Sequence, residues 1–250
     1  MSVGTILNTR PIAYKSQTHK AFHKKGFSII DFPCIEIAAP NDMNQVKNQL
    51  NDIKSKGIIV FTSPQAVRFA FKIKSEWKIP QPILIIAVGP KTAEMLEQYT
   101  SHNIFTPEQH NSHGVIELIQ GLNYSDSMTL ICAKGGRQRI KKFALDNRIN
   151  FSQINVYQRK IPSNVSAFDW IDCDNLNVSI LATSINSLDN LKILTGKSHW
   201  LKLKDQLLVC ASKRIETHAH EIGCLNTLNT NSANPKVMSN KLAEHIKKTC

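Results

Sequence analysis

The chain has 250 residues, of which 42% are hydrophobic and 20% are charged. These values are typical of folded globular proteins, and the length suffices for one large domain or two modest ones with separate cores. The longest apolar run, residues 83–88, is far shorter than the ~18 residues that span a membrane. The N-terminus lacks a secretory signal pattern, so we expect a cytoplasmic protein with no membrane contact.

The net charge of +12 indicates a surface that concentrates an anionic partner, such as nucleic acid, an acidic lipid surface or a small polyanion. The six cysteines are scattered, without zinc-ligand spacing, and are expected to be reduced thiols. His19 with His23 and His110 with His113 have spacings that permit a metal, but no carboxylate is placed to complete either pair. P-loop, dinucleotide-binding and nucleophile-elbow motifs are absent as well. We therefore expect neither a metal nor a cofactor.

In chain order, short aliphatic or β-branched runs alternate with amphipathic helical patterns, and four segments of the first half recur about 120 residues further on. The recurring pairs are residues 5–10 with 129–134, 27–32 with 151–156, 59–63 with 180–184, and 85–89 with 208–212. Short buried strands alternating with helices predict an α/β fold of two similar lobes, each a parallel sheet with flanking helices. A polar, Asn-rich stretch at 226–234 is expected to be a flexible connection before a terminal helix at 237–248, with no function assigned.

The functional content lies where strands pass into helices. Ligands of parallel sheets bind at the carboxyl ends of the strands, where helix N-termini present unpaired N–H groups. The six junctions are at residues 9–11, 62–64, 89–92, 134–137, 183–184 and 211–214. Ser, Thr, Gly and Pro also serve simply to begin helices, which explains any one junction taken alone. Together, in a basic chain, the six predict a cleft that gathers several carboxylates or phosphates.

The order and spacing of these junctions resemble the uroporphyrinogen-III synthase family, from about Leu7 to Gly223. The motifs are NTRP (8–11), PCIEI (33–37), FTSPQAV (61–67), AVGPKTA (87–93), GR (136–137), VYQR (156–159), ATS (182–184) and SKR (212–214). The resemblance implies an outer α/β domain of residues 1–34 with 163–250 and an inserted α/β domain of residues 36–157. The implied two-stranded connector lies near residues 33–37 and 156–161.

The resemblance also implies an activity, the cyclisation of hydroxymethylbilane to uroporphyrinogen III by a cofactor-independent hydro-lyase. The last pyrrole ring is inverted during closure, and water is lost. Tyr157 matches the family's Val-Tyr position and is the expected catalytic residue, because a phenol can donate a proton to the departing hydroxyl. The residues expected to bind the substrate's carboxylates are Arg10, Thr62, Ser63, Thr92, Gly136, Arg137, Thr183, Ser184, Ser212 and Arg214, with Lys91 and Lys134 as weaker candidates.

The sequence departs from the family pattern at the last junction, where Ser212 and Ile215 stand in place of a glycine and a threonine. The expected partner is a linear tetrapyrrole polycarboxylate, with a transient contact to the preceding deaminase and a monomeric state. The alternative is a non-catalytic, two-lobed binder of a polyanion, either a small anion or a nucleic acid. Dispersed lysines without interleaved aromatic residues argue against nucleic acid.

Overall fold

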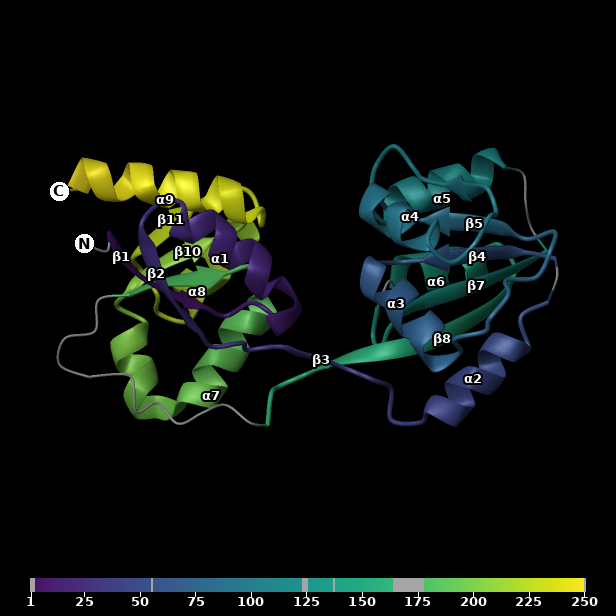
Figure 1. Cartoon of the computed structure of the whole chain (residues 1–250), viewed down its shortest axis with the longest axis horizontal. Coiled ribbons are helices and arrows are strands. Elements are labelled where there is room, and N and C mark those ends of the chain that lie inside the picture. Colours follow the sequence, from purple (N-terminus) through teal and green to yellow (C-terminus); the bar gives the residue numbers. More distant parts are fainter. Residues whose placement is uncertain (1–2, 55, 123–125, 137, 164–177, 250) are drawn as a thin grey trace. The chain divides into compact units, whose positions relative to one another are not determined.

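The computed structural model describes residues 3–54, 56–122, 126–136, 138–163 and 178–249 (Figure 1). The chain divides into two compact units. Unit 1 comprises residues 1–36 and 160–250, and unit 2 comprises residues 37–159. In the described part of the chain, no helix combines the length and apolarity that a membrane crossing requires.

Unit 1 is built on a five-stranded parallel sheet in the order β11-β10-β9-β1-β2. The strands are β1 (Gly4–Asn8), β2 (Phe27–Asp31), β9 (Val178–Ala182), β10 (Leu207–Cys210) and β11 (Thr227–Asn229). The helices are η1 (Ile12–Tyr14), α1 (Lys15–His23), α7 (Ile185–Leu203), α8 (Lys213–Glu221) and α9 (Pro235–Thr249). Helices α1 and α9 lie side by side, and a core that includes Phe22, Leu188 and Leu242 joins helices to sheet (Figure 1).

Unit 2 is built on a six-stranded sheet in the order β3-β8-β7-β4-β5-β6. The strands are β3 (Glu36–Ala38), β4 (Ile58–Phe61), β5 (Leu84–Ala87), β6 (Ile104–Phe105), β7 (Ser127–Ala133) and β8 (Asn150–Lys160). The helices are α2 (Met43–Asn51), α3 (Pro64–Ile73), α4 (Pro90–Leu96), α5 (Ser112–Gly121) and α6 (Gln138–Asp146).

The continuous apolar run of β4 follows from the two covered faces of this sheet. Ile59 and Phe61 pack in one core cluster, which includes residues of α2 and α3. Ile58 and Val60 pack in a second cluster, which includes residues of α5 and α6. Successive side chains of a strand point to opposite faces, so a strand that is covered on both sides has to be apolar at every position.

The two units share one strand order, and this confirms the predicted fold class. Strands β2-β1-β9-β10-β11 of unit 1 correspond in order to β8-β7-β4-β5-β6 of unit 2. Each of the four recurring sequence segments forms the corresponding strand in the two sheets. The internal repeat in the sequence therefore reflects a repeated parallel sheet.

The prediction for residues 226–234 was wrong in part, because Thr227–Asn229 form the edge strand β11. Backbone pairing with β10 holds this strand, and the Thr227 and Asn229 side chains donate hydrogen bonds to Glu216 of α8. Asparagine has low strand propensity, but tertiary contacts at a sheet edge override it. The terminal helix also begins earlier than predicted, at Pro235. Proline favours the first position of a helix, because it has no N–H to leave unpaired there.

The four cysteines that the structure describes are buried thiols that form no disulfide with one another: Cys34, Cys132, Cys210 and Cys224. Burial raises the thiol pKa of Cys210 to about 12 and that of Cys224 to about 11. These thiols are therefore protonated and unreactive at neutral pH. Cys173 and Cys250 lie outside the described residues.

Candidate functional site

Each sheet gathers three of the predicted junctions at one edge. In unit 1 the junctions at residues 9–11, 183–184 and 211–214 follow β1, β9 and β10, which are consecutive neighbours. In unit 2 the junctions at residues 62–64, 89–92 and 134–137 follow β4, β5 and β7, which are also consecutive. Because the carboxyl ends of parallel strands meet at one edge, each unit collects its junction residues in one place.

Tyr157 lies near the end of β8 in unit 2 and is only 3% exposed. Its hydroxyl oxygen is 3.2 Å from Ser63 Oγ, and its ring stacks on Phe69 with centroids 5.6 Å apart. A register shift in the β7–β8 pairing leaves Val156 and Tyr157 both buried in the cluster that includes residues of α3. A bulge of this kind re-aims a side chain, and here it brings a polar hydroxyl to the helix beside the sheet edge.

The other predicted residues of unit 2 differ in how their side chains are occupied. Thr62 Oγ1 donates a hydrogen bond to the Ile131 carbonyl at 3.2 Å, so this hydroxyl fastens β4 to β7. Thr92 is buried at the start of α4. Gly136 closes the turn after β7, where an added Cβ would come within 3.1 Å of the Ala133 carbonyl oxygen. Lys91 and Lys134 are exposed, and Arg137 lies outside the described residues.

A polar cavity of about 330 Å³ adjoins Tyr157 in unit 2. Its lining combines the Lys134 side chain with several amides, and it includes the Asp42 carboxylate, which accepts a hydrogen bond from Gln45 N at the start of α2. Buried Gln158 donates from Nε2 to the Ala39 carbonyl and to Asn41 Oδ1, both at 2.8 Å. The lining residues are Pro40, Asn41, Asp42, Gln45, Val46, Gln49, Lys134, Gln153, Asn155, Tyr157 and Gln158.

Arg10 lies at the end of β1 in unit 1 and is only 8% exposed. Its Nη1 is buried and has no hydrogen-bond partner among the residues that the structure describes, while the guanidinium lies 5.3 Å from the centroid of the Tyr14 ring. Burial lowers the pKa of the Arg10 guanidinium from its ordinary value, because the charged form is poorly solvated there. A buried cation with a spare donor is suited to bind an anionic ligand.

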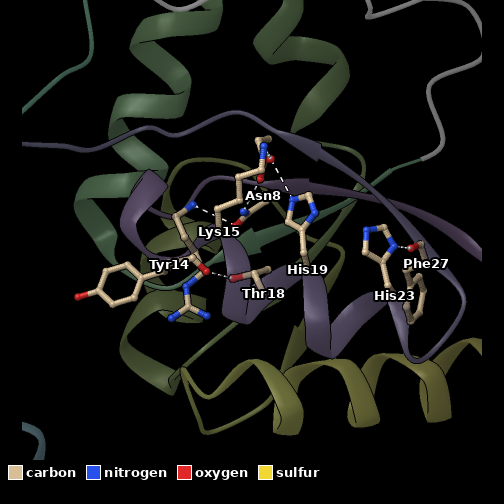
Figure 2. A network of polar contacts seen from close by, with 9 residues as sticks. Asn8, Tyr14, Lys15, Thr18, His19, His23 and Phe27 are labelled. Carbon is tan, nitrogen blue, oxygen red and sulfur yellow. Dashed lines mark hydrogen bonds and ion pairs between the residues drawn. The ribbon is translucent and has the colours of Figure 1, made fainter.

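A polar network at the ends of β1 and β2 includes Asn8, Lys15 and His19 (Figure 2). Asp31 accepts a hydrogen bond from Asn8 Nδ2 at 2.8 Å, and its Oδ2 lies 2.9 Å from both Lys15 Nζ and His19 Nε2. Figure 2 shows Lys15 and His19 reaching from α1 toward Asn8 at the strand end. Asn8 Oδ1 also accepts from the Arg10 backbone N–H, so the network orients the junction residue.

This network corrects one sequence expectation, because the structure places the Asp31 carboxylate beside His19. His19 and Asp31 come from a helix and a strand that pack together, which sequence spacing does not show. Lys15 shares the same carboxylate oxygen, so this contact is part of an ion-pair network. Among the described residues, no group of three or more His, Cys, Asp or Glu side chains has the arrangement of a metal site.

The remaining predicted residues of unit 1 lie at the starts of α7 and α8. Ser184 Oγ caps α7 by accepting from Ser187 N, in a reciprocal capping box. Ser212 is the N-cap of α8, but its side chain makes no capping bond. Thr183 is partly buried and Arg214 is exposed. Ser212 therefore keeps a hydroxyl that a ligand can use, whereas the Ser184 hydroxyl already serves its helix.

Sequence reasoning missed the three residues that support the two key side chains. Phe69 packs on Tyr157, and Asn8 and Asp31 form the network beside Arg10. The only available signal was position, since Asn8 and Asp31 are the last residues of their strands. Strand-end polar residues are common in turns, so that signal by itself is not specific.

Comparison with known proteins supplies the family. The sequence model of a family described as uroporphyrinogen-III synthase HemD matches residues 16–230. The chain belongs to the uroporphyrinogen-III synthase family. It is similar to the uroporphyrinogen-III synthase of Proteus mirabilis, with 25% identity over 175 residues that cover 66% of this chain and 87% of that protein. A porphyrin biosynthesis protein HemD of Ruminiclostridium josui is 24% identical over 161 residues, which cover 61% of this chain and 31% of that protein.

Solved structures of uroporphyrinogen III synthases share the fold. A mutant of the enzyme from the extremely thermophilic bacterium Thermus thermophilus matches with a TM-score of 0.65 and 11% identity, over 99% of this chain and 100% of that one. The enzyme from Helicobacter pylori matches with a TM-score of 0.63 and 15% identity, over 98% of this chain and 100% of that one. The family match makes this chain a lyase-type cyclising enzyme of porphyrin biosynthesis.

Proposed function

We propose that this chain converts hydroxymethylbilane to uroporphyrinogen III as a cofactor-independent hydro-lyase. The observation that carries the proposal is Tyr157, whose hydroxyl is hydrogen-bonded at the sheet edge where the junctions of unit 2 gather. The family match over residues 16–230 supports the reaction type. The substrate carries acetate and propionate groups on every ring, and the buried Arg10 guanidinium offers a donor suited to one of them.

In the proposed reaction the phenol of Tyr157 donates its proton to the substrate hydroxyl as the carbon–oxygen bond breaks. Water leaves with the bonding electron pair, and an electrophilic azafulvene remains. The last pyrrole ring attacks the azafulvene through its substituted α carbon, which gives a spiro intermediate. The original methylene bond to that carbon then breaks, its electron pair returns to the ring, and the released methylene carbon bonds to the free α carbon, so that the ring is inverted. The proton lost when the closing pyrrole regains aromaticity balances the proton that Tyr157 gave. The protein's main contribution is to hold the flexible bilane so that the inverted ring closes.

Carboxylate binding is proposed for three groups of residues. Arg10 has a buried donor without a hydrogen-bond partner among the described residues, Ser212 makes no capping bond, and Thr92 is buried at the start of α4. Thr183 offers the backbone of its junction, and Arg214, Lys91 and Lys134 are exposed cations. The Gly136 N–H already donates to the Ala133 carbonyl at 3.0 Å, so a ligand has to compete with this turn. Thr62 and Ser184 use both their hydroxyls and their backbone N–H groups in hydrogen bonds within the fold, which makes them the weakest of the predicted carboxylate binders.

The domain arrangement and assembly are also proposals. The division of the structure into residues 1–36 with 160–250 and residues 37–159 supports an inserted domain within an outer one. We propose that the protein acts as a monomer and receives the bilane through a transient contact with the preceding deaminase, because the free bilane closes unaided to the type I isomer. Sedimentation velocity of the protein alone and with the deaminase tests both statements.

The decisive experiment couples the purified protein to the deaminase that makes hydroxymethylbilane, oxidises the products and separates the type I and type III isomers. Predominantly type III product is expected. An isomer ratio equal to that of the deaminase alone, with folded protein present, contradicts the proposed function. Calorimetric titration with the reduced tetrapyrrole product then tests the alternative, a polyanion binder, which the charge of +12 also favours.

A further inference from the structure

We propose that Ser63 is a positioning residue for Tyr157: helix α3 holds the phenol at two points, its hydroxyl through Ser63 and its ring through Phe69. This inference rests on the proposed function and refines it, because Ser63 was predicted to bind the substrate directly. The two contacts are the 3.2 Å approach of Ser63 Oγ to the Tyr157 hydroxyl and the ring stacking of Phe69 on Tyr157. Both supporting residues belong to one rigid element, six residues apart.

The hydrogen bonds at Ser63 permit the hydroxyl orientation that the proposed reaction requires. Ser63 Oγ already accepts from the Ala66 backbone N–H at 3.1 Å, as the N-cap of α3. A serine hydroxyl has one proton to donate, and donating it to the Tyr157 oxygen leaves the phenol proton free for a substrate oxygen. When Tyr157 gives that proton away, the same Ser63 O–H stabilises the phenolate oxygen that forms.

The fold explains why this contact requires a tyrosine. Ser63 follows β4 and Tyr157 lies on β8, and β7 runs between these two strands. Neighbouring strands are about 4.8 Å apart, so a side chain has to span roughly two strand spacings to reach Ser63. The paired residue at the end of β7 is the small Ala133. The Phe69 ring, inclined by 20° to the Tyr157 ring, then fixes the plane of the phenol.

The corresponding helix start in unit 1 lacks this arrangement. Ser184 caps α7 as Ser63 caps α3, but its side-chain contacts are all with Ser187, on its own helix. In the internal repeat, the position that corresponds to Tyr157 is Pro33, which has no hydroxyl. Capping alone therefore does not require a tyrosine, and the Ser63–Tyr157 contact is specific to unit 2.

Ser63→Gly separates positioning from capping, because it removes the hydroxymethyl side chain but glycine is itself tolerated at an N-cap. We expect the rate of type III formation at saturating bilane to fall about tenfold, with KM unchanged, since a hydrogen bond to a forming charge is lost. Ser63→Thr keeps the hydroxyl and restores the rate. The matched control is Asn111→Gly, which removes the side-chain cap of α5 in the same unit and is expected to leave the rate unchanged.

A second measurement follows Tyr157 itself. In protein labelled with ¹³C at tyrosine Cζ, the four tyrosines give separate signals, and the signal lost in Tyr157→Phe belongs to Tyr157. We expect Ser63→Gly to move this signal, Ser63→Thr to restore it, and Asn111→Gly to leave it in place. An unmoved signal in Ser63→Gly, or a raised KM with an unchanged rate at saturation, overturns the proposal. A wild-type protein without type III product contradicts the proposed function instead, and the signal still decides whether Ser63 holds Tyr157.

Discussion

The two units share a strand order but place different chemistry at corresponding strand ends. At the end of β1, unit 1 has Arg10, which is buried, and the repeat places the exposed Lys134 at the corresponding end of β7 in unit 2. At the next strand, unit 1 ends β2 with Asp31 in an ion-pair network, and unit 2 has Asn155 there, followed by Tyr157. One unit therefore holds a buried positive charge, and the other holds a phenol.

Under the proposed function, this difference assigns different chemical roles to two copies of one fold. A parallel sheet brings its strand ends together whatever residues they carry, so the same fold can hold different functional groups at those ends. Under the proposed function, unit 1 supplies an anion-binding guanidinium and unit 2 supplies the proton donor. Substitutions at corresponding positions can test this assignment of roles.

The largest effect is expected from removing the phenol of unit 2. Tyr157→Phe keeps the stack on Phe69 and loses the hydroxyl, so type III formation should fall about 100-fold, the scale of general acid catalysis. The isomer assay measures this loss. Tyr99→Phe is the matched control, because Tyr99 also stacks on a phenylalanine but is exposed. If Tyr157→Phe formed type III product at the wild-type rate and isomer ratio, Tyr157 would not be the proton donor.

Arg10→Met tests the charge of unit 1. We expect KM for the bilane to rise roughly 10- to 100-fold, because a charged hydrogen bond to a carboxylate is lost. The free energy of unfolding should rise by about 1 kcal/mol, since an apolar residue replaces a buried charge that has an unpaired donor.

Urea unfolding and the isomer assay together measure both effects of Arg10→Met. Arg68→Met, at an exposed position of α3, is the control and should change neither quantity. Destabilisation of Arg10→Met by several kcal/mol would mean that the guanidinium serves the fold and is not held ready for a ligand.

Asp31→Asn gives the end of β2 the residue that unit 2 has at the corresponding position, Asn155, and so tests what the Asp31 charge contributes to unit 1. Burial raises the pKa of Asp31, but hydrogen bonds from Lys15, Asn8 and His19 outweigh burial and hold it below its ordinary value. A depressed folded-state pKa contributes stability above about pH 4, and that stability is lost as the pH falls through the folded pKa.

The free energy of unfolding of Asp31→Asn should therefore be about 1–3 kcal/mol below that of the wild type at pH 6, and this gap should close below pH 4. Denaturant titrations across this range measure the gap. The control Asp146→Asn, at an exposed position of unit 2, should show no pH-dependent difference in stability from the wild type. A gap independent of pH would show that the Asp31 charge does not carry the stabilisation.

The smallest effect is expected at His218 of unit 1, which is paired with two carboxylates. A hydrogen bond to Asp189 at 2.6 Å raises the pKa of His218, with a further contribution from Glu221. A raised folded-state pKa adds stability that is complete below about pH 6.5 and is lost as the pH rises through the folded pKa. The Tm difference between wild type and His218→Gln should narrow from pH 6 to pH 9. His113→Gln in unit 2, whose pair with Glu117 is exposed, should show little difference throughout.

Much of the fold could be predicted from the sequence, because strand and helix patterns and the internal repeat are local signals. Buried strands such as β4 are apolar at every position, and helix starts such as Ser63-Pro64 carry capping residues that spacing reveals. The edge strand β11 was not predictable, because its polar residues are held by pairing with β10 and by Glu216. Of the candidate site, the junctions were predictable, but the state of each side chain was not.

The sequence by itself determined which residues end the strands, because those positions follow from patterns a few residues long. The tertiary structure alone decided that Arg10 is buried with a spare donor and that Tyr157 reaches Ser63, 94 residues away in the chain. It also decided that the hydroxyls of Thr62 and Ser184 serve the fold while that of Ser212 makes no capping bond. Burial and hydrogen bonding depend on which strands become neighbours, and strand order arises from the packing of the whole unit.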